Sequence, residues 1–242
     1  MANGKVHVPK IILRESSYGD IDKVVNELAS ELGKDKINRF MLDLGLSSDQ
    51  FETSGRGFTF KKDEPLLMTF KKNPHKGDLT AHQIVNTWEE ANIADIIYGY
   101  GEEKYSRRIA RAIVSYREKK SIETTGELVE IISHAVPAFY RRGRLHPATR
   151  TFQALRIAVN DELNTLKKGL VNGFERLEKG GRIAVISFHS LEDRIVKNFN
   201  KEKADAGEAT IITKKPIVPA EKEILENPRS RSAKLRILEK NK

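Results

Sequence analysis

The stretch Gly180–Phe199, GGRIAVISFHSLEDRIVKNF, decides the fold that this sequence predicts. Its apolar run Ile183–Ile186 is typical of a fully buried strand, and Ser187–Ser190 turns the chain into an amphipathic helix. Ser190 and Asp193 have the spacing of a capping box at the start of that helix. A strand, turn and helix of this kind predicts an α/β sheet, in which ligands bind beyond the carboxyl ends of the strands.

Upstream segments predict a matching half of the sheet. A short apolar run at Lys10–Leu13 precedes a helix that Asp20 can cap and that ends at Gly33, and a second buried strand then ends at Asp43. The order strand, helix, strand indicates half of a parallel doubly wound sheet. Asp43, followed by the turn at Gly45, suits a ligand with hydroxyl or amine donors, and capping of the next turn explains it equally well.

The middle of the chain has a different pattern. Residues 50–76 lack periodicity and predict a long functional loop. Four helices follow, the third over Glu102–Lys119 and the fourth opened by the capping box of Thr124 and Glu127, and one long helix over Phe152–Leu177 returns to the sheet. We therefore predict three parts: residues 1–75 as one part of a sheet domain, 76–150 as an inserted helical domain, and 151–242 as the rest of the sheet domain.

The end of the chain predicts an edge to the sheet. Asn200–Glu208 is polar and predicts a flexible loop. Ala209–Thr213 and Ala233–Leu238 are strand-like, and prolines lie between them. Two strands joined by a long loop favour an antiparallel edge.

Composition limits the class of partner. Lys and Arg outnumber Asp and Glu by 43 to 34, for a net charge of +9, which favours a polyanionic partner, nucleic acid before membrane. The chain has no cysteine, so thiolate chemistry and cysteine-based zinc sites are excluded, and no zincin or other metal-site motif is present. The first residues, MANGKVHVPK, lack the apolar core of a signal peptide, so we expect a cytoplasmic protein.

Two segments carry candidate functional side chains. Ser187, His189, Ser190 and Asp193 combine nucleophile, base and acid types, but capping explains two of them, and His189 has the alternative role of a turn histidine. Phe139–Arg150, FYRRGRLHPATR, is rich in arginine beside aromatic residues, which is typical of an RNA phosphate contact or of a disordered basic linker. Its candidate RNA-binding residues are Arg141, Arg142, Arg144, His146 and Arg150.

Several blocks together resemble a known family. They are DLGLSSDQFE from Asp43, RGFTF from Arg56, YGEEKYSRRIARAIV from Tyr100, HPATRTFQALRIAVNDEL from His146, GGRIAVISFHSLEDRIVK from Gly180 and KKPIVPAEKEILENPRSRSAKLR from Lys214. In this order they are similar to the RsmH (MraW) family of bacterial methyltransferases. The resemblance implies a class I, Rossmann-like methyltransferase sheet with an inserted all-helical domain, and methyl transfer from S-adenosylmethionine to the N4 amine of a P-site cytidine in 16S rRNA.

The resemblance also implies that residues 1–75 are a partial sheet domain, that the helical domain of residues 76–150 recognises the substrate, and that individual residues have specific roles. Tyr18, Asp43 and Gln50 match positions that contact the cofactor in the family, and the SFHS edge and the basic segment are expected to face RNA. Direct transfer requires an acceptor for a hydrogen bond from the cytosine amine as positive charge develops on it. Asp43, Ser187 and His189 are the catalytic acceptors that we predict.

The sequence departs from the family pattern at its start. The family begins with a strand, a glycine-rich DxTxGxxGHS loop and a second strand, and none of these motifs occurs here, so Met1–Lys10 is predicted to be an unrelated or degenerate leader. The expectation is either an N-terminally truncated sheet or a divergent form without the cofactor loop. Two functions follow: the methyltransferase, or a non-catalytic RNA-binding protein. An incomplete sheet also predicts marginal stability or self-association.

Overall fold

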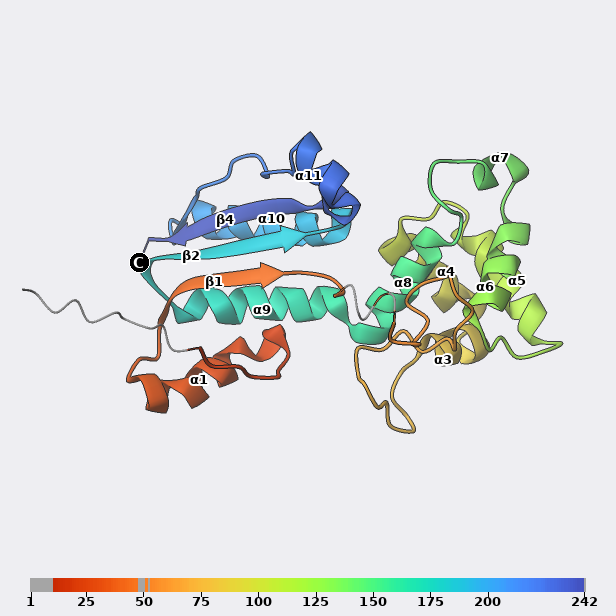
Figure 1. The fold of residues 1–242 in the computed structure, drawn as a ribbon, viewed down its shortest axis with the longest axis horizontal. Helices are drawn as coiled ribbons and strands as arrows, with labels where there is room; N and C mark the ends of the chain where they lie inside the picture. Colours follow the sequence, from red (N-terminus) through yellow and green to blue (C-terminus); the bar gives the residue numbers. More distant parts are fainter. Residues whose placement is uncertain (1–10, 48–50, 52, 242) are drawn as a thin grey trace, which may run out of the picture. The chain divides into compact units, whose positions relative to one another are not determined.

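The chain folds into two compact units. The computed structural model describes residues 11–47, 51 and 53–241. A sheet unit is formed by the chain up to Asp43 and from Thr165 onward, and a helical unit by Leu44–Asn164 lies between these two segments in the sequence. The predicted α/β class is therefore confirmed (Figure 1). The helical unit begins before residue 75 and ends after residue 150. These bounds describe compact packing and do not test the predicted functional division at residues 75 and 150, which stays a prediction.

The sheet unit contains a mixed sheet of four strands in the order β1-β2-β4-β3. The strands are β1 (Ile37–Asp43), β2 (Leu177–Ser187), β3 (Ala209–Ile211) and β4 (Lys234–Lys240). β1 and β2 are parallel, and β4 is antiparallel to both β2 and β3. Both predicted strands are present, but the prediction of full burial is wrong, because burial alternates along β1 and β2 and Met41 of β1 is exposed. The predicted antiparallel edge is confirmed, and the carboxyl ends of β1 and β2 lie at the same edge of the sheet.

Helices cover the face of the sheet that carries its apolar side chains. The helices and turns of this unit are η1 (Tyr18–Asp20), α1 (Ile21–Leu32), α9 (Glu162–Arg176, which begins in the helical unit), α10 (Ser190–Asp205), α11 (Glu221–Glu226) and η2 (Pro228–Ser232). Phe40 of β1 pairs in register with Ile183 of β2, and Ile183 pairs with Leu238 of β4. The three buried side chains therefore point to the same face of the sheet. Each contributes about 1.5–3 kcal/mol by burial.

Gly173 lets α9 lie close to this face. A Cβ at Gly173 would come within 2.2 Å of the Phe40 ring, so the phenylalanine occupies the space that a side chain on the helix would need. α10 packs on the same face of the sheet, because its Asp193 reaches Arg236 of β4. The opposite face is less covered, and Met41 of β1 is 63% exposed there.

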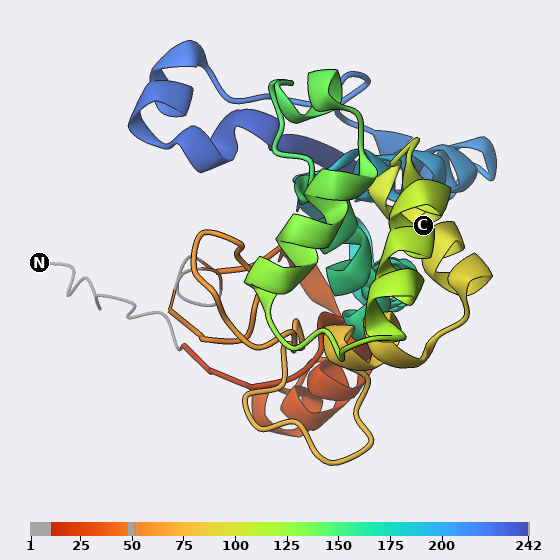
Figure 2. The same cartoon turned by 90° about the vertical axis from the view of Figure 1, so that its right-hand side faces the viewer.

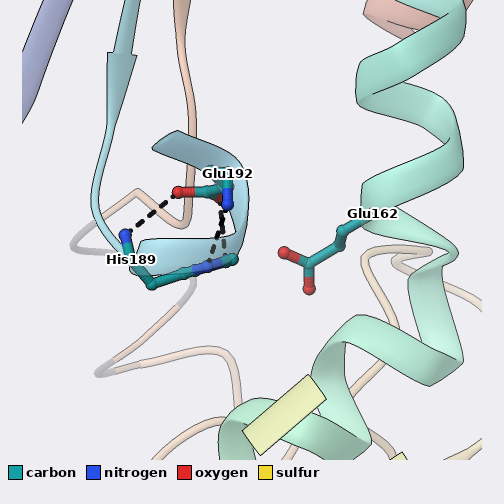
Figure 3. Close-up of side chains that lie close together, drawn as sticks. All are labelled: Glu162, His189 and Glu192. Atoms are coloured by element: carbon teal, nitrogen blue, oxygen red, sulfur yellow. Dashed lines mark hydrogen bonds and ion pairs between the residues drawn. The ribbon is translucent and has the colours of Figure 1, made fainter. Parts of the chain in front are cut away.

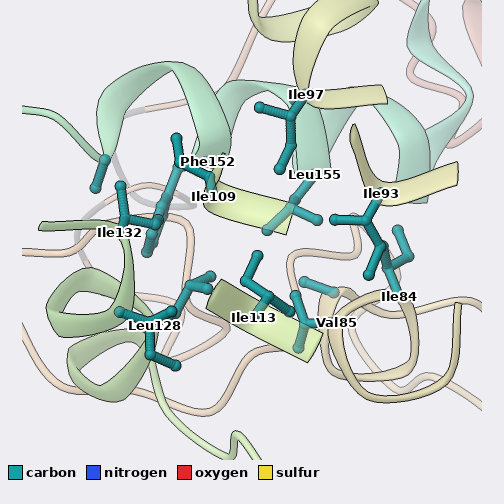
Figure 4. Packing of buried hydrophobic residues seen from close by; sticks show 14 of the residues in the cluster. Ile84, Val85, Ile93, Ile97, Ile109, Ile113, Leu128, Ile132, Phe152 and Leu155 are labelled. Carbon is teal, nitrogen blue, oxygen red and sulfur yellow. The ribbon is translucent and has the colours of Figure 1, made fainter. Parts of the chain in front are cut away.

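The helical unit is built on one apolar core. Its helices are α3 (Ala81–Thr87), α4 (Glu90–Gly101), α5 (Ser106–Arg117), α6 (Thr125–Ala135), α7 (Ala138–Arg141) and α8 (Thr149–Asn160). α5 packs against both α4 and α6 (Figure 2), and α8 packs against α4. Fully buried side chains such as Ile97, Ile113, Leu128 and Leu155 meet in this core (Figure 4). The predicted capping box of Thr124 and Glu127 opens α6 and is confirmed.

Two predicted elements of the sheet unit are wrong. Residues 11–13 of the predicted strand Lys10–Leu13 are irregular, with Ile11 and Leu13 more than 80% exposed, because this short apolar run has no described strand to pair with. Asn200–Glu208 is not a loop, since α10 continues to Asp205. The buried face of α10 extends through Phe199 and Asn200, which favours helix over the polarity of the residues that follow.

Two predicted helices have different limits. The third begins at Ser106 and not at Glu102, because Glu102 has a left-handed backbone (φ 50°) and caps the end of α4. The long helix Phe152–Leu177 is divided into α8 and α9 at Asp161, whose φ of 47° ends α8. Apolar spacing continues across this break, so periodicity alone does not reveal it.

Candidate functional site

Asp43 is the exposed carboxylate at the end of β1. It follows the buried Leu42, and its partner in the parallel register is Ile186 of β2. In the part of the chain that the structure describes, the carboxylate makes no ion pair or hydrogen bond. A strand thus holds its backbone rigidly while the side chain stays available to a ligand. This arrangement suits an acceptor for hydroxyl or amine donors.

Ser187 ends β2 at the same edge of the sheet but points to the other face. Since Asp43 pairs with Ile186 and side chains alternate along a strand, the next residue, Ser187, faces the opposite side. Its side chain is buried and its hydroxyl donates a weak hydrogen bond of 3.4 Å to the Lys234 carbonyl. The structure therefore does not bring Asp43 and Ser187 together on one face.

His189 caps α10. Its Nδ1 accepts a hydrogen bond from the Glu192 N–H at 3.4 Å, and the Glu192 carboxylate accepts one from the His189 N–H (Figure 3). The same carboxylate also accepts a hydrogen bond from the Phe188 N–H. The other ring nitrogen, Nε2, lies 3.2 Å from the Glu192 Oε1, and it makes no hydrogen bond with the described part of the chain. Glu162, also drawn in Figure 3, belongs to the helical unit and pairs with Arg156.

The predicted capping box of Ser190 and Asp193 is wrong, because the helix begins one residue earlier. His189 is the N-cap and Glu192 the third helical residue, so the reciprocal pair is shifted by one position. Asp193 therefore does not cap the helix. Its carboxylate instead accepts hydrogen bonds from Arg236 at 2.7 Å and from Lys234 at 3.3 Å.

Asp193 and Arg236 form a largely buried ion pair between α10 and β4. Burial by itself favours the neutral acid, but the Arg236 guanidinium and the Lys234 ammonium hold the pKa of Asp193 below its usual value. Arg236 is only 8% exposed, so it depends on this carboxylate for compensation of its charge. The pair fixes the start of α10 to β4, next to the turn Ser187–Ser190.

Tyr18 and Gln50 are the other predicted cofactor contacts. Tyr18 opens η1 and is partly buried against the backbone of α9, because a Cβ at Gly169 would lie 2.9 Å from its ring. Gln50 lies outside the described residues. The predicted cofactor role of all three residues, Tyr18, Asp43 and Gln50, stays a prediction.

The predicted RNA-binding segment divides into two groups. Arg141, Arg142 and Arg144 are exposed and make no ion pair with the residues that the structure describes. His146 stacks on Phe60, with ring centroids 4.6 Å apart, and burial lowers the pKa of this histidine. Its ring is therefore neutral near pH 7 and suited to stacking more than to pairing with phosphate.

Arg150 also has a contact inside the fold. Its Nη1 donates a hydrogen bond to the Glu102 carbonyl at 2.9 Å, at the end of α4. Arg141, Arg142 and Arg144 thus make no hydrogen bond or ion pair through their guanidinium groups with the described residues. His146 and Arg150, in contrast, hold the segment to Phe60 and to the end of α4. Their RNA contacts stay predictions.

Comparison with known proteins identifies the family. The family model described as the MraW methylase family matches residues 4–241. The chain belongs to the MraW methylase family. A relative from Persephonella marina, named ribosomal RNA small subunit methyltransferase H, is 50% identical over 93% of this chain and 74% of its own length. Relatives of the same name from Synechococcus elongatus and Brevibacillus brevis are 52% and 43% identical, over 89% and 97% of this chain and 70% and 77% of their own lengths.

Membership of the MraW methylase family makes this chain a methyltransferase by homology and corrects one prediction. Because the match begins at residue 4, residues 4–10 are not unrelated to the family, and of the two predicted alternatives for Met1–Lys10 only the degenerate one stays a prediction. Within the described residues, no helix is both long and apolar enough to span a bilayer.

Sequence reasoning missed two side chains near the end of β2 in this member of the family. Glu192 was not recognised as the partner of His189, and Arg236 was not connected to Asp193. The alternative spacing His189–Glu192 was readable in the sequence, since it also places an acid three residues after a polar cap. The Asp193–Arg236 pair was not, because it joins residues 43 positions apart.

Proposed function

We propose that this chain uses S-adenosylmethionine to methylate the N4 amine of a cytidine in the P-site region of small-subunit rRNA. The exposed Asp43 carboxylate at the end of β1 is the observation that carries the proposal. Support comes from the family, from relatives named ribosomal RNA small subunit methyltransferase H, and from the net charge of +9. The exposed Arg141, Arg142 and Arg144 supply positive charge for the RNA backbone.

The chemistry of the side chains fits the cofactor in one respect. S-adenosylmethionine presents hydroxyl and ammonium donors, and a carboxylate without a described partner is a suitable acceptor for either. Asp43, Tyr18 and Gln50 are the residues that would hold it. When bound, the cofactor supplies an activated methyl group on a sulfonium.

The chain's own residues have three tasks in the reaction. The arginines of the basic segment bind the RNA backbone, and the target base must leave its stack to reach the strand ends. A carboxylate such as Asp43 then accepts a hydrogen bond from the cytosine amine, orients its lone pair and stabilises the charge that develops on the nitrogen. Ser187 and His189 are weaker candidates for this acceptor, since both are engaged within the fold.

The first experiment separates the methyltransferase from a non-catalytic RNA-binding protein. Titration calorimetry with S-adenosylmethionine is expected to show binding, and incubation with small-subunit RNA is expected to give N4-methylcytidine by mass spectrometry of the digested RNA. A folded sample that binds the RNA but neither binds the cofactor nor transfers a methyl group would sink the proposal and favour the binding protein.

Substitution of Asp43 then tests the residue itself. Asp43→Asn and Asp43→Ala are expected to lower methyl transfer by about a hundredfold, the scale of one missing catalytic hydrogen bond. Loss of cofactor binding would assign the carboxylate to the cofactor, and loss of transfer with binding retained would make it the acceptor for the amine. Asp205→Asn, an exposed acid at the end of α10, is the matched control. Unchanged binding and transfer in Asp43→Ala would remove Asp43 from the site.

A further inference from the structure

The helical unit contains a pocket between α4 and α5. Its volume is about 390 Å³, within the range of roughly 300–1,000 Å³ in which proteins hold small ligands. α4 contributes one wall, and the connection to α5 with the first turn of that helix contributes the other. The lining residues are Ala94, Asp95, Tyr98, Lys104, Tyr105, Ser106, Arg107 and Arg108.

The buried Glu103 holds the α5 wall of the pocket in place through hydrogen bonds. Glu103 is fully buried, and its carboxylate accepts hydrogen bonds from the Tyr105 N–H at 2.8 Å and from the Tyr140 hydroxyl at 2.5 Å. Burial and the nearby Glu103 carboxylate raise the pKa of Tyr140 to about 12, so the phenol remains a donor at neutral pH. Tyr105 and Tyr140 meet edge to face, with centroids 4.9 Å apart. The wall is therefore held by interactions within the fold.

Three cations stand on this wall. The Lys104 Nζ lies 5.1 Å from the Tyr105 ring centroid and 5.4 Å from that of Tyr140, and the Arg108 guanidinium lies 5.9 Å from Tyr105. Arg107 is exposed beside them. None of the three cations pairs with a carboxylate in residues 11–47, 51 and 53–241. Cations held over aromatic rings without a counter-ion favour an anionic ligand.

The opposite wall has different chemistry. Tyr98 is 67% exposed, although a tyrosine usually buries much of its ring. Asp95 lies three positions before it on α4, so the two side chains share a face of the helix. An exposed ring offers a stacking surface for a base, and a carboxylate accepts a hydrogen bond from an exocyclic amine.

We propose that this pocket binds one unpaired nucleotide of the RNA substrate, with its phosphate at Lys104, Arg107 and Arg108 and its base on Tyr98. The inference rests on the proposed function, because it takes RNA as the substrate. The cationic wall suits the phosphate of a nucleotide, and the exposed Tyr98 ring on the opposite wall suits its base. The excess of three cations over one acid favours the phosphodiester backbone over a neutral ligand. Tyr140 connects this wall to the segment with Arg141, Arg142 and Arg144, which extends the basic surface.

Binding of short RNAs tests the pocket directly. The probe is a fluorescein-labelled oligocytidylate, followed by anisotropy over a range of salt concentrations and compared with a duplex RNA of equal length. R107Q/R108Q is expected to weaken binding and to reduce the salt slope by about 0.7 for each phosphate that the variant no longer neutralises. Tyr98→Ala is expected to weaken binding by about tenfold, and Tyr98→Phe to retain it, since stacking needs only the ring.

Arg111→Gln is the matched control. Arg111 lies on α5 outside the pocket, is exposed, and is 3.7 Å from Glu90. The substitution removes one positive charge from the same helix, as R107Q or R108Q alone does, so Arg111→Gln is expected to bind the oligocytidylate more tightly than either of these single variants. All these exposed substitutions are expected to leave the thermal unfolding temperature unchanged.

The outcomes keep the two proposals distinct. If the wild-type chain methylates RNA but R107Q/R108Q and Tyr98→Ala bind the oligocytidylate as Arg111→Gln does, the pocket is not a nucleotide site and the proposed function stands. Equal binding of duplex RNA, or displacement of the probe by oligoglutamate at the same charge concentration, would also overturn the inference. If the wild-type chain neither binds nor methylates RNA, both proposals fail.

Discussion

The ends of β1 and β2 are neighbours in one sheet but differ in the availability of their polar groups. At the end of β1, Asp43 is exposed and makes no hydrogen bond or ion pair with the described part of the chain. At the end of β2, Ser187 is buried, and His189 caps a helix. Both ends have the sequence pattern of a ligand site, yet the polar groups that follow β2 are engaged within the fold. A polar strand end is therefore evidence for a site only when its groups remain unsatisfied.

The largest expected effect falls on the β2 end. Asp193→Asn is expected to lower the free energy of unfolding by about 3 kcal/mol, because it leaves the Arg236 charge buried without compensation. Urea denaturation followed by circular dichroism measures this loss. Asp205→Asn on the same helix is the control and is expected to stay within about 0.5 kcal/mol of wild type. Equal stability of the two variants would show that the pair does not hold α10 to the sheet.

The same ion pair predicts a dependence on pH. The pKa of Asp193 is lowered in the folded chain, so its stabilisation is fully present above the pKa of the unfolded acid, about 3.9, and is lost as the pH falls through the lower folded value. The stability difference between wild type and Asp193→Asn is therefore expected to be constant from pH 7 to about pH 5 and to shrink below about pH 4. A difference that persists at the lowest pH would contradict the assignment.

A smaller effect separates capping from catalysis at His189. His189→Ala is expected to cost about 1 kcal/mol of stability, the usual value for removal of an N-cap, and His189→Asn to recover most of it, because the asparagine side chain can accept from the Glu192 N–H. Urea denaturation measures the stability of both variants. Methyl transfer by His189→Asn is expected to be close to wild type. If His189→Asn is as stable as wild type but transfers methyl groups at least about tenfold more slowly, the imidazole is a catalytic group. The polar groups after β2 would then serve the reaction as Asp43 is proposed to do.

The smallest change in stability is expected on the exposed face of β1. Within the described residues, β1 is an edge strand, and Met41 is exposed on the face that Asp43 shares. Met41→Lys is expected to alter the free energy of unfolding by less than about 0.5 kcal/mol while reducing self-association. Sedimentation velocity over a range of protein concentrations measures this effect. A wild-type chain that stays monomeric throughout would refute the predicted self-association.

Much of the fold could be predicted from local patterns. The apolar runs that end at Asp43 and Ile186 predicted strands, and the spacing of Thr124 and Glu127 predicted a helix start, since each depends on neighbouring residues. Local patterns failed at Asp161, where a left-handed residue divides two helices without interrupting the apolar spacing. They also failed at Ser190, because two capping boxes one residue apart were both possible.

The sequence by itself determined the family, the α/β class, the basic character and the position of polar residues at two strand ends. Only the tertiary structure decided which of them are available. In the register of β1 against β2, Asp43 and Ser187 lie on opposite faces of the sheet. Near the end of β2, Asp193 is paired with Arg236, which is distant in the sequence. The pocket at Tyr98 and Arg108 likewise requires α4 and α5 to pack together. Residue types and spacings specify what a side chain can do, whereas its exposure and partners depend on segments that meet only in the folded chain.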